Sequence, residues 1–295
     1  MATRLRPVAA LHIHGRFWRG VRCQSTTREA ASSQKLVAQL PVGIGFSAAG
    51  LLFPYYVGCG KALTAHGVLT PQTKLAGASA GSLIAASLVS GRSTEDVLDA
   101  LRHMVADLRQ SGTRGRLKGV LERILRDLLP EDIADRARGR CFVAVTRLSG
   151  SPRRLLQGEL VSEFEDKSDF IAALLTSCFI PFYFHSMAPA TRFRGAWCAD
   201  GGLSQFLPTP PLQLCPGGLI RISTFPTYTL SGMGVDICPD APGVDGAPTP
   251  VPYDMSRLLQ WALTPATDKV LDALVAQGEA DAGRWVARMG LGRGP

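Results

Sequence analysis

A pentapeptide of small residues places the strongest constraint on this chain. Residues 75–88 read LAGASAGSLIAASL, in which Gly77–Gly81 fits the pattern G-x-S-x-G around Ser79. Such a pattern often places a serine at a sharp turn between a buried strand and a helix, with its hydroxyl exposed. The flanks agree, because Thr73–Ala76 reads as a strand and Ser82–Val89 as a helix. Ser79 is a candidate nucleophile, although such small residues also occur where a helix packs closely against a sheet.

A strand and a helix are also predicted before this motif. Leu40–Phe46 reads as a short buried strand, and the apolar spacing after it predicts a helix that ends at Gly67. Strands joined by a helix imply a parallel sheet and the α/β class. Further strands are predicted at 141–147, 154–157 and 219–223, the first two paired around a turn, and helices at 93–109, 117–128, 169–178, 255–263 and 266–289.

Composition indicates a globular protein. The chain of 295 residues is 46% hydrophobic and 19% charged, and no run of about 18 apolar residues predicts a spanning helix. No repeat or linker divides residues 37–295, so we expect a single catalytic domain with C-terminal helices. On the predicted helix 117–128, Lys118, Arg123 and Arg126 fit either a membrane-facing surface or an ordinary solvated one.

The basic charge is concentrated at the N-terminus. The net charge is +8, of which residues 1–35 supply +6 from seven Lys or Arg and one Glu, so the remaining chain does not predict nucleic-acid binding. Residues 1–36 are rich in Arg, Ser, Thr and Ala, as organellar transit peptides are, although a disordered basic tail fits as well. Val21–Cys23 resembles a plastid processing site, which favours the plastid over the mitochondrion.

The cysteines do not predict a metal site or a disulfide framework. Their number is seven, none forms a C-x-x-C pair, and none lies near a histidine at metal-ligand spacing. Buried free thiols in a reducing compartment are expected.

A serine hydroxyl is a weak nucleophile by itself, so the next question is which residue could act as the base that accepts the Ser79 proton. Of the five histidines, only His185 lies in the downstream half. The sequence therefore offers a single candidate for a catalytic triad whose histidine comes late in the chain. Asp200 is better placed, since it follows a short apolar run and precedes Gly201 and Gly202. Its carboxylate can act as the base if burial raises its pKa, although a plain Asp-Gly-Gly turn is the simpler interpretation.

The segment after the first strand supplies candidate oxyanion donors. Ser47 is followed by Ala48, Ala49 and Gly50 at the start of a predicted helix, where backbone amides stabilise negative charge. A nucleotide site is not favoured, because the glycines here do not match G-x-G-x-x-G.

Taken in order, the oxyanion-type loop, G-x-S-x-G and Asp-Gly-Gly resemble the patatin-like phospholipases over roughly residues 42–210. The resemblance implies a three-layer α/β fold, with helices on both faces of a mostly parallel sheet. It also implies a Ser79–Asp200 dyad without histidine, metal or cofactor, and with Gly50 in the oxyanion loop. The expected substrate is a fatty acyl ester of a lipid, met at a transient membrane or lipid-droplet surface, with acyl transfer as a related activity.

Two departures from the family pattern keep alternatives open. The family's loop is often richer in glycine than this one, and no asparagine follows the Asp-Gly-Gly turn. A non-catalytic lipid-binding protein on the same fold and a Ser-Asp-His esterase that uses His185 therefore remain alternatives. Aromatic residues that fit either a groove for the acyl chain or the core are Phe53, Tyr55, Tyr56, Phe179, Phe182, Tyr183 and Phe184.

Overall fold

The computed structural model describes residues 41–291, except 151–154, 186, 231, 243–245, 247–248 and 250. The expected transit peptide or basic tail, residues 1–36, lies outside the described residues and stays a prediction.

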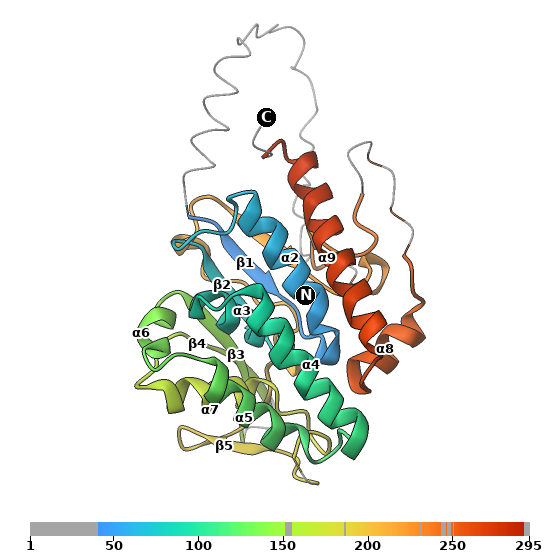
Figure 1. Ribbon diagram of the computed structural model, residues 1–295. Helices are drawn as coiled ribbons and strands as arrows, with labels where there is room; N and C mark the ends of the chain where they lie inside the picture. Colours follow the sequence, from blue (N-terminus) through green and yellow to red (C-terminus); the bar gives the residue numbers. More distant parts are fainter. Residues whose placement is uncertain are drawn as a thin grey trace, which may run out of the picture. The chain divides into compact units, whose positions relative to one another are not determined.

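A seven-stranded mixed sheet forms the centre of the fold (Figure 1). Its strands are β1 (Gly43–Phe46), β2 (Lys74–Ala78), β3 (Cys141–Leu148), β4 (Leu156–Val161), β5 (Thr191–Phe193), β6 (Ala196–Asp200) and β7 (Leu219–Ile222). They follow the order β5-β6-β3-β2-β1-β7, and β4 pairs with β3 off this path. The neighbours β7, β1, β2 and β3 run parallel, whereas β4, β5 and β6 run antiparallel to the strands they pair with.

One edge of β3 is shared by two strands. β2 and β6 pair with the same edge of β3, and β4 pairs with the opposite edge. This follows because each residue of Val143–Val145 pairs with β4 and also with either β2 or β6. On the shared edge, Ala144 pairs with Ala78, the last residue of β2, and the next residue of β3 pairs with Asp200, the last residue of β6. Since β2 and β6 run in opposite directions, their carboxyl ends meet here.

Helices flank the sheet, so the expected α/β class is confirmed. They are α2 (Phe53–Ala65), α3 (Ala80–Ser90), α4 (Thr94–Ser111), α5 (Leu117–Leu128), α6 (Ile133–Ala137), α7 (Lys167–Ser177), α8 (Met255–Leu263) and α9 (Asp268–Arg288). Local signals explain their starts: the Ser93 hydroxyl accepts a hydrogen bond of 3.0 Å from the Asp96 amide at the start of α4. Short 3₁₀ turns lie at Gly50–Leu52, Gly201–Leu203, Leu212–Leu214 and Thr227–Thr229.

The predicted burial of the cysteines as free thiols is confirmed for the part of the chain that the structure describes. Cys59, Cys141, Cys178, Cys198, Cys215 and Cys238 are all buried and free. Burial raises the pKa of the Cys141 thiol to about 12, so it behaves as a small core residue.

The packing of α2 against α9 depends on glycine. The two helices lie side by side (Figure 1). A Cβ at Gly58 would lie 2.0 Å from the Val275 carbonyl oxygen, and a Cβ at Gly278 would lie 2.0 Å from the Tyr55 carbonyl oxygen. The backbones therefore approach too closely for any side chain at these two positions.

This contact predicts opposite effects for two alanine substitutions in α9. Gly278→Ala should lower the free energy of unfolding by about 1–3 kcal/mol, because the helices must separate. A Cβ at Gly283 would meet no atom within 4 Å. Gly283→Ala should therefore raise the free energy of unfolding by up to about 1 kcal/mol, because alanine has a higher helix propensity than glycine. Urea denaturation of both variants checks this, and equal effects would contradict the close contact.

Candidate active site

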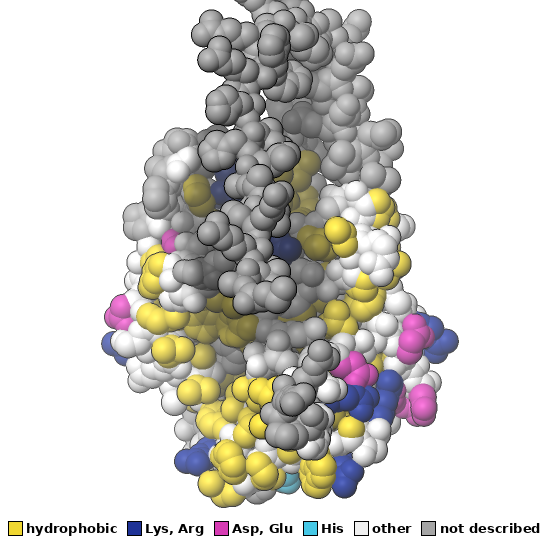
Figure 2. All heavy atoms as spheres, turned by 180° about the vertical axis from the view of Figure 1, so that it is seen from behind, with side chains coloured by type: hydrophobic (Ala, Val, Ile, Leu, Met, Phe, Trp, Pro, Cys, Tyr) yellow, Lys and Arg dark blue, Asp and Glu magenta, His cyan; other side chains and the backbone are white. Residues whose placement is uncertain are grey.

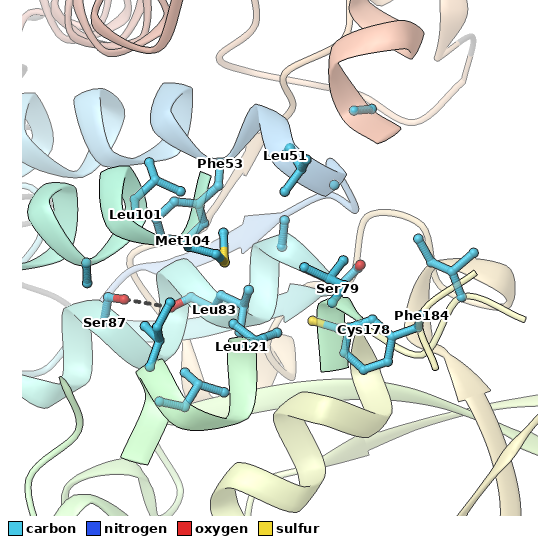
Figure 3. Close-up of a pocket in the computed structure, with 18 of the residues that line it drawn as sticks. Leu51, Phe53, Ser79, Leu83, Ser87, Leu101, Met104, Leu121, Cys178 and Phe184 are labelled. Carbon is cyan, nitrogen blue, oxygen red and sulfur yellow. Dashed lines mark hydrogen bonds between the residues drawn. The ribbon is translucent and has the colours of Figure 1, made fainter. Parts of the chain in front are cut away.

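Ser79 lies in the sharp turn between β2 and α3, as its motif predicts. It is the N-cap of α3, and its backbone has φ of 52° and ψ of −125°. A non-glycine residue with positive φ is strained by roughly 1–3 kcal/mol and persists only where its surroundings enforce it. Its side chain is nearly buried and lines a pocket (Figure 3).

The two motif glycines make this turn possible. A Cβ at Gly77 would lie 2.0 Å from the Gly81 carbonyl oxygen, across the turn. A Cβ at Gly81 would lie 2.4 Å from the Phe46 carbonyl oxygen, at the end of β1. Gly77 therefore allows the turn to close, and Gly81 allows α3 to start against β1.

Asp200 ends β6 at a second sharp turn, where glycines again permit close approach. The Gly202 amide donates a hydrogen bond of 2.8 Å to Asp200 Oδ1. A Cβ at Gly201 would lie 2.1 Å from the Ala144 carbonyl oxygen, and one at Gly202 would lie 2.8 Å from Ala48 Cβ. The Asp-Gly-Gly turn thus packs against both β3 and the loop after β1.

The environment of Asp200 suits a proton acceptor. Burial raises the pKa of its carboxyl from 3.8 to about 6, and the Ser79 hydroxyl and Gly202 amide offset part of the rise. Asp200 Oδ2 is buried and has no hydrogen-bond partner among the described residues. The carboxylate therefore combines a vacant acceptor atom with a pKa close to neutral.

One short segment at the C-terminal end of α7 holds the backbones of both residues, and we call Ser177–Phe179 the bracket. Ser177 Oγ accepts a hydrogen bond of 2.9 Å from the Ser79 amide, and the Phe179 carbonyl accepts one of 2.8 Å from the Asp200 amide. Ser177 is fully buried. The sequence analysis missed Ser177, because no local pattern shows that its hydroxyl reaches a residue 98 positions earlier.

The predicted oxyanion loop is present, but its three amides differ. The Ala48 amide donates a hydrogen bond of 2.8 Å to the Phe206 carbonyl, so it is already engaged. No hydrogen bond within the described part of the chain engages the amides of Ala49 and Gly50. Gly50 has φ of 56°, and a Cβ there would lie 2.1 Å from the Ala262 carbonyl oxygen. Ala49 and Gly50 are therefore the remaining candidate donors.

The described histidines lie away from this arrangement. His66, His103 and His185 each line a different surface depression, and none lines the Ser79 pocket. Across the described residues, no cluster of His, Cys, Asp and Glu is arranged to hold a metal ion. No described helix is both long and apolar enough to cross a membrane.

The pocket beside Ser79 is lined almost entirely by apolar side chains, and more than half of the lining residues lie on α3, α4 and α5. Ser79 and Cys178 lie at one end, whereas Leu101, Met104 and Leu121 line the part between α4 and α5 (Figure 3). The apolar faces of α4 and α5 thus turn toward a pocket as well as the core.

The structure divides the aromatic candidates between the pocket and the core. Three of its residues line the pocket, namely Phe53, Tyr183 and Phe184. Tyr55, Tyr56 and Phe179 instead pack in the core, and Phe182 is half exposed.

Sequence comparison identifies the family of this chain. A family model described as patatin-like phospholipase matches residues 46–212, more than half of the chain. The chain belongs to this family. The matched range contains Ser79, Asp200 and the bracket, so the family region coincides with the candidate site.

Curated relatives fall in the same family. The chain is 30% identical to human patatin-like phospholipase domain-containing protein 2, over 84% of this chain and 49% of that protein. It is 29% identical to human 1-acylglycerol-3-phosphate O-acyltransferase PNPLA3, over 84% and 51%. It is 32% identical to mouse omega-hydroxyceramide transacylase, over 69% and 33%. The chain thus spans about half the length of the first two relatives and a third of the last.

The raised pKa of Asp200 predicts a stability effect with a definite sign. The carboxyl is protonated in both states below pH 3.8 and ionised in both above about 6, so the ionised form destabilises the fold increasingly between these values. Asp200→Asn should therefore leave stability unchanged near pH 3.5 and raise it by roughly 3 kcal/mol at pH 7. Thermal unfolding at both pH values checks this, and a loss of stability at pH 7 would contradict the assigned environment.

The bracket predicts that Ser177 positions the nucleophile. Ser177→Ala leaves the buried Ser79 amide without an acceptor, which costs about 1–3 kcal/mol and loosens the strained turn. Acylation by an activated ester should slow while KM changes little. Ser90→Ala is the matched control, because Ser90 is also buried and its hydroxyl bonds only within the C-terminal part of α3 and the turn after it. Equal acylation rates in the two variants would remove Ser177 from this role.

Proposed function

We propose that this chain is a serine lipid acyl hydrolase that acts through a Ser79–Asp200 dyad and an acyl-enzyme. The observation that carries the proposal is the buried, unpartnered Asp200 Oδ2 on a carboxylate that interacts with the strained Ser79. A structural Asp-Gly-Gly turn alone does not require a buried carboxylate oxygen without a hydrogen bond.

In the first step, Ser79 Oγ attacks the ester carbonyl carbon as Asp200 Oδ2 accepts the hydroxyl proton. At neutral pH most of the carboxylate is ionised, because its pKa is about 6. Activity should therefore fall as the pH drops through about 6, when the base becomes protonated.

The tetrahedral intermediate carries a negative oxygen that needs donors. The vacant amides of Ala49 and Gly50 lie at the start of a 3₁₀ turn and can supply them. Asp200 then returns its proton to the leaving alcohol. A water molecule, deprotonated by the same carboxylate, then attacks the acyl carbon. Asp200 passes this proton to Ser79 Oγ as the bond to the acyl group breaks, which releases the fatty acid and restores the serine hydroxyl.

The pocket supports a fatty acyl substrate. Aliphatic side chains of α4 and α5 form an apolar wall of the Ser79 pocket, and none of the described residues that line it is charged. Such a surface favours a hydrocarbon chain over a polar acyl group. The ester would be drawn from a membrane or a lipid droplet.

Acyl transfer is a second candidate function. Two relatives carry the names acyltransferase and transacylase. The apolar pocket favours this activity, because an acyl-enzyme shielded from water survives longer for attack by an alcohol.

A fluorophosphonate probe tests the proposal directly. It should modify Ser79 and no other serine, and Ser79→Ala should not label while retaining its melting temperature. Peptide mapping that places the adduct on Ser82 or Ser87 would overturn the assignment. A folded protein that takes no label would support the non-catalytic lipid-binding alternative.

A further inference from the structure

A basic and apolar surface lies next to the Ser79 pocket and has no role in the chemistry above. It is formed by residues 114–123 together with residues 182–185 and Met187, and we call it the rim. Figure 2 shows apolar side chains with Lys and Arg beside them at the end of the molecule where β5 lies, and residues 182–185 and Met187 shortly precede β5.

The two segments are joined by backbone hydrogen bonds. The Gly115 amide donates to the Tyr183 carbonyl at 2.7 Å, and the Lys118 amide donates to the Phe184 carbonyl at 3.2 Å. On one side of this junction, Leu117, Tyr183 and Phe184 line the Ser79 pocket. On the other side, a shallow polar depression is lined by Gly115, Arg116, Lys118, Gly119, Val120, Glu122, Arg123 and His185. One wall therefore separates the pocket from the rim.

The charges of the rim are unbalanced. Its two facing acids are already paired, Asp107 with Arg116 and Glu122 with Arg126. Arg114, Lys118 and Arg123 form no ion pair with any residue that the structure describes. Asp127, one turn after Arg123, lines a separate depression. Three positive charges thus remain available at this surface.

Exposed apolar side chains accompany these charges. Phe182 is 49% exposed and Met187 is 64% exposed. Phe182 also has φ of 61°, an unusual backbone for a bulky residue, while the Phe182 amide bonds to the Ala188 carbonyl at 3.0 Å. The Arg114 guanidinium holds both residues, through the Phe182 carbonyl and Met187 Sδ. A strained loop thus holds an aromatic ring in water instead of burying it.

We propose that the rim docks this protein onto anionic phospholipid bilayers, with Phe182 and Met187 in the interface and Arg114, Lys118 and Arg123 against lipid phosphates. The combination of apolar side chains and adjacent cations matches the layering of an anionic membrane surface. Docking in this orientation sets the shared wall, and hence the Ser79 pocket, at the lipid surface. That docking brings the Ser79 pocket to its substrate rests on the proposed function, whereas the binding of the rim to a bilayer does not.

Sedimentation with vesicles tests the charges. The full chain carrying Ser79→Ala, which removes hydrolysis, is compared on phosphatidylcholine vesicles with and without phosphatidylglycerol. Adding Lys118→Gln and Arg123→Gln should weaken binding to the anionic vesicles roughly 30-fold at low salt. The control pair Lys61→Gln and Lys74→Gln removes the same charge from α2 and the start of β2 and should bind like the parent.

Two further variants exclude misfolding as the cause. Lys118→Arg with Arg123→Lys keeps the charge and should restore binding. Phe182→Gly relaxes the positive φ while it removes the ring, and it should weaken binding roughly tenfold. The proposal is overturned if the parent binds neutral and anionic vesicles equally, or if the rim and control pairs lose the same affinity. Because every arm lacks Ser79, failure of catalysis would leave these results intact.

Discussion

The backbone pairing along one edge of β3 determines the geometry of the site. Two strands that run in opposite directions end at adjacent residues of β3, so the turns that follow them face each other. Ser79 and Asp200 meet for this reason, although 120 positions separate them in the sequence. The sheet therefore supplies the placement that the proposed catalytic pair needs, and the bracket adds support from a third element.

The same placement carries energetic costs that the rest of the fold must offset. Ser79 holds a strained backbone, and Asp200 holds a buried carboxylate with an unpaired oxygen. The bracket binds both backbones from a third element, which keeps the two turns from relaxing independently. Strain and burial of this kind are expected where a structure trades stability for function.

Much of this arrangement follows from local sequence patterns. The Ser79 turn, the Asp-Gly-Gly turn and most helices carry their own signals in glycines, caps and apolar spacing. The engagement of the Ala48 amide by Phe206 and the reach of Ser177 depend on long-range packing, which a single sequence does not show. The sequence does not predict the β5–β6 hairpin, because its two-residue turn is Arg194–Gly195, both at positive φ, and not the Asn-Gly or Asp-Gly pair that signals such a turn. Several aromatic candidates for the groove lie in the core instead, because both environments take the same kind of side chain and the sequence does not distinguish them.

The central claim is that Asp200, and not a histidine, takes the proton of Ser79. Pre-steady-state acylation by an activated ester tests it in four folded variants: Asp200→Asn, His66→Gln, His103→Gln and His185→Gln. The account predicts a fall of roughly 10²–10⁴-fold for Asp200→Asn, the range typical of positioned acid–base catalysis, and near wild-type rates for the histidine variants. A collapse of the acylation rate in His185→Gln, with Asp200→Asn close to wild type, would contradict it.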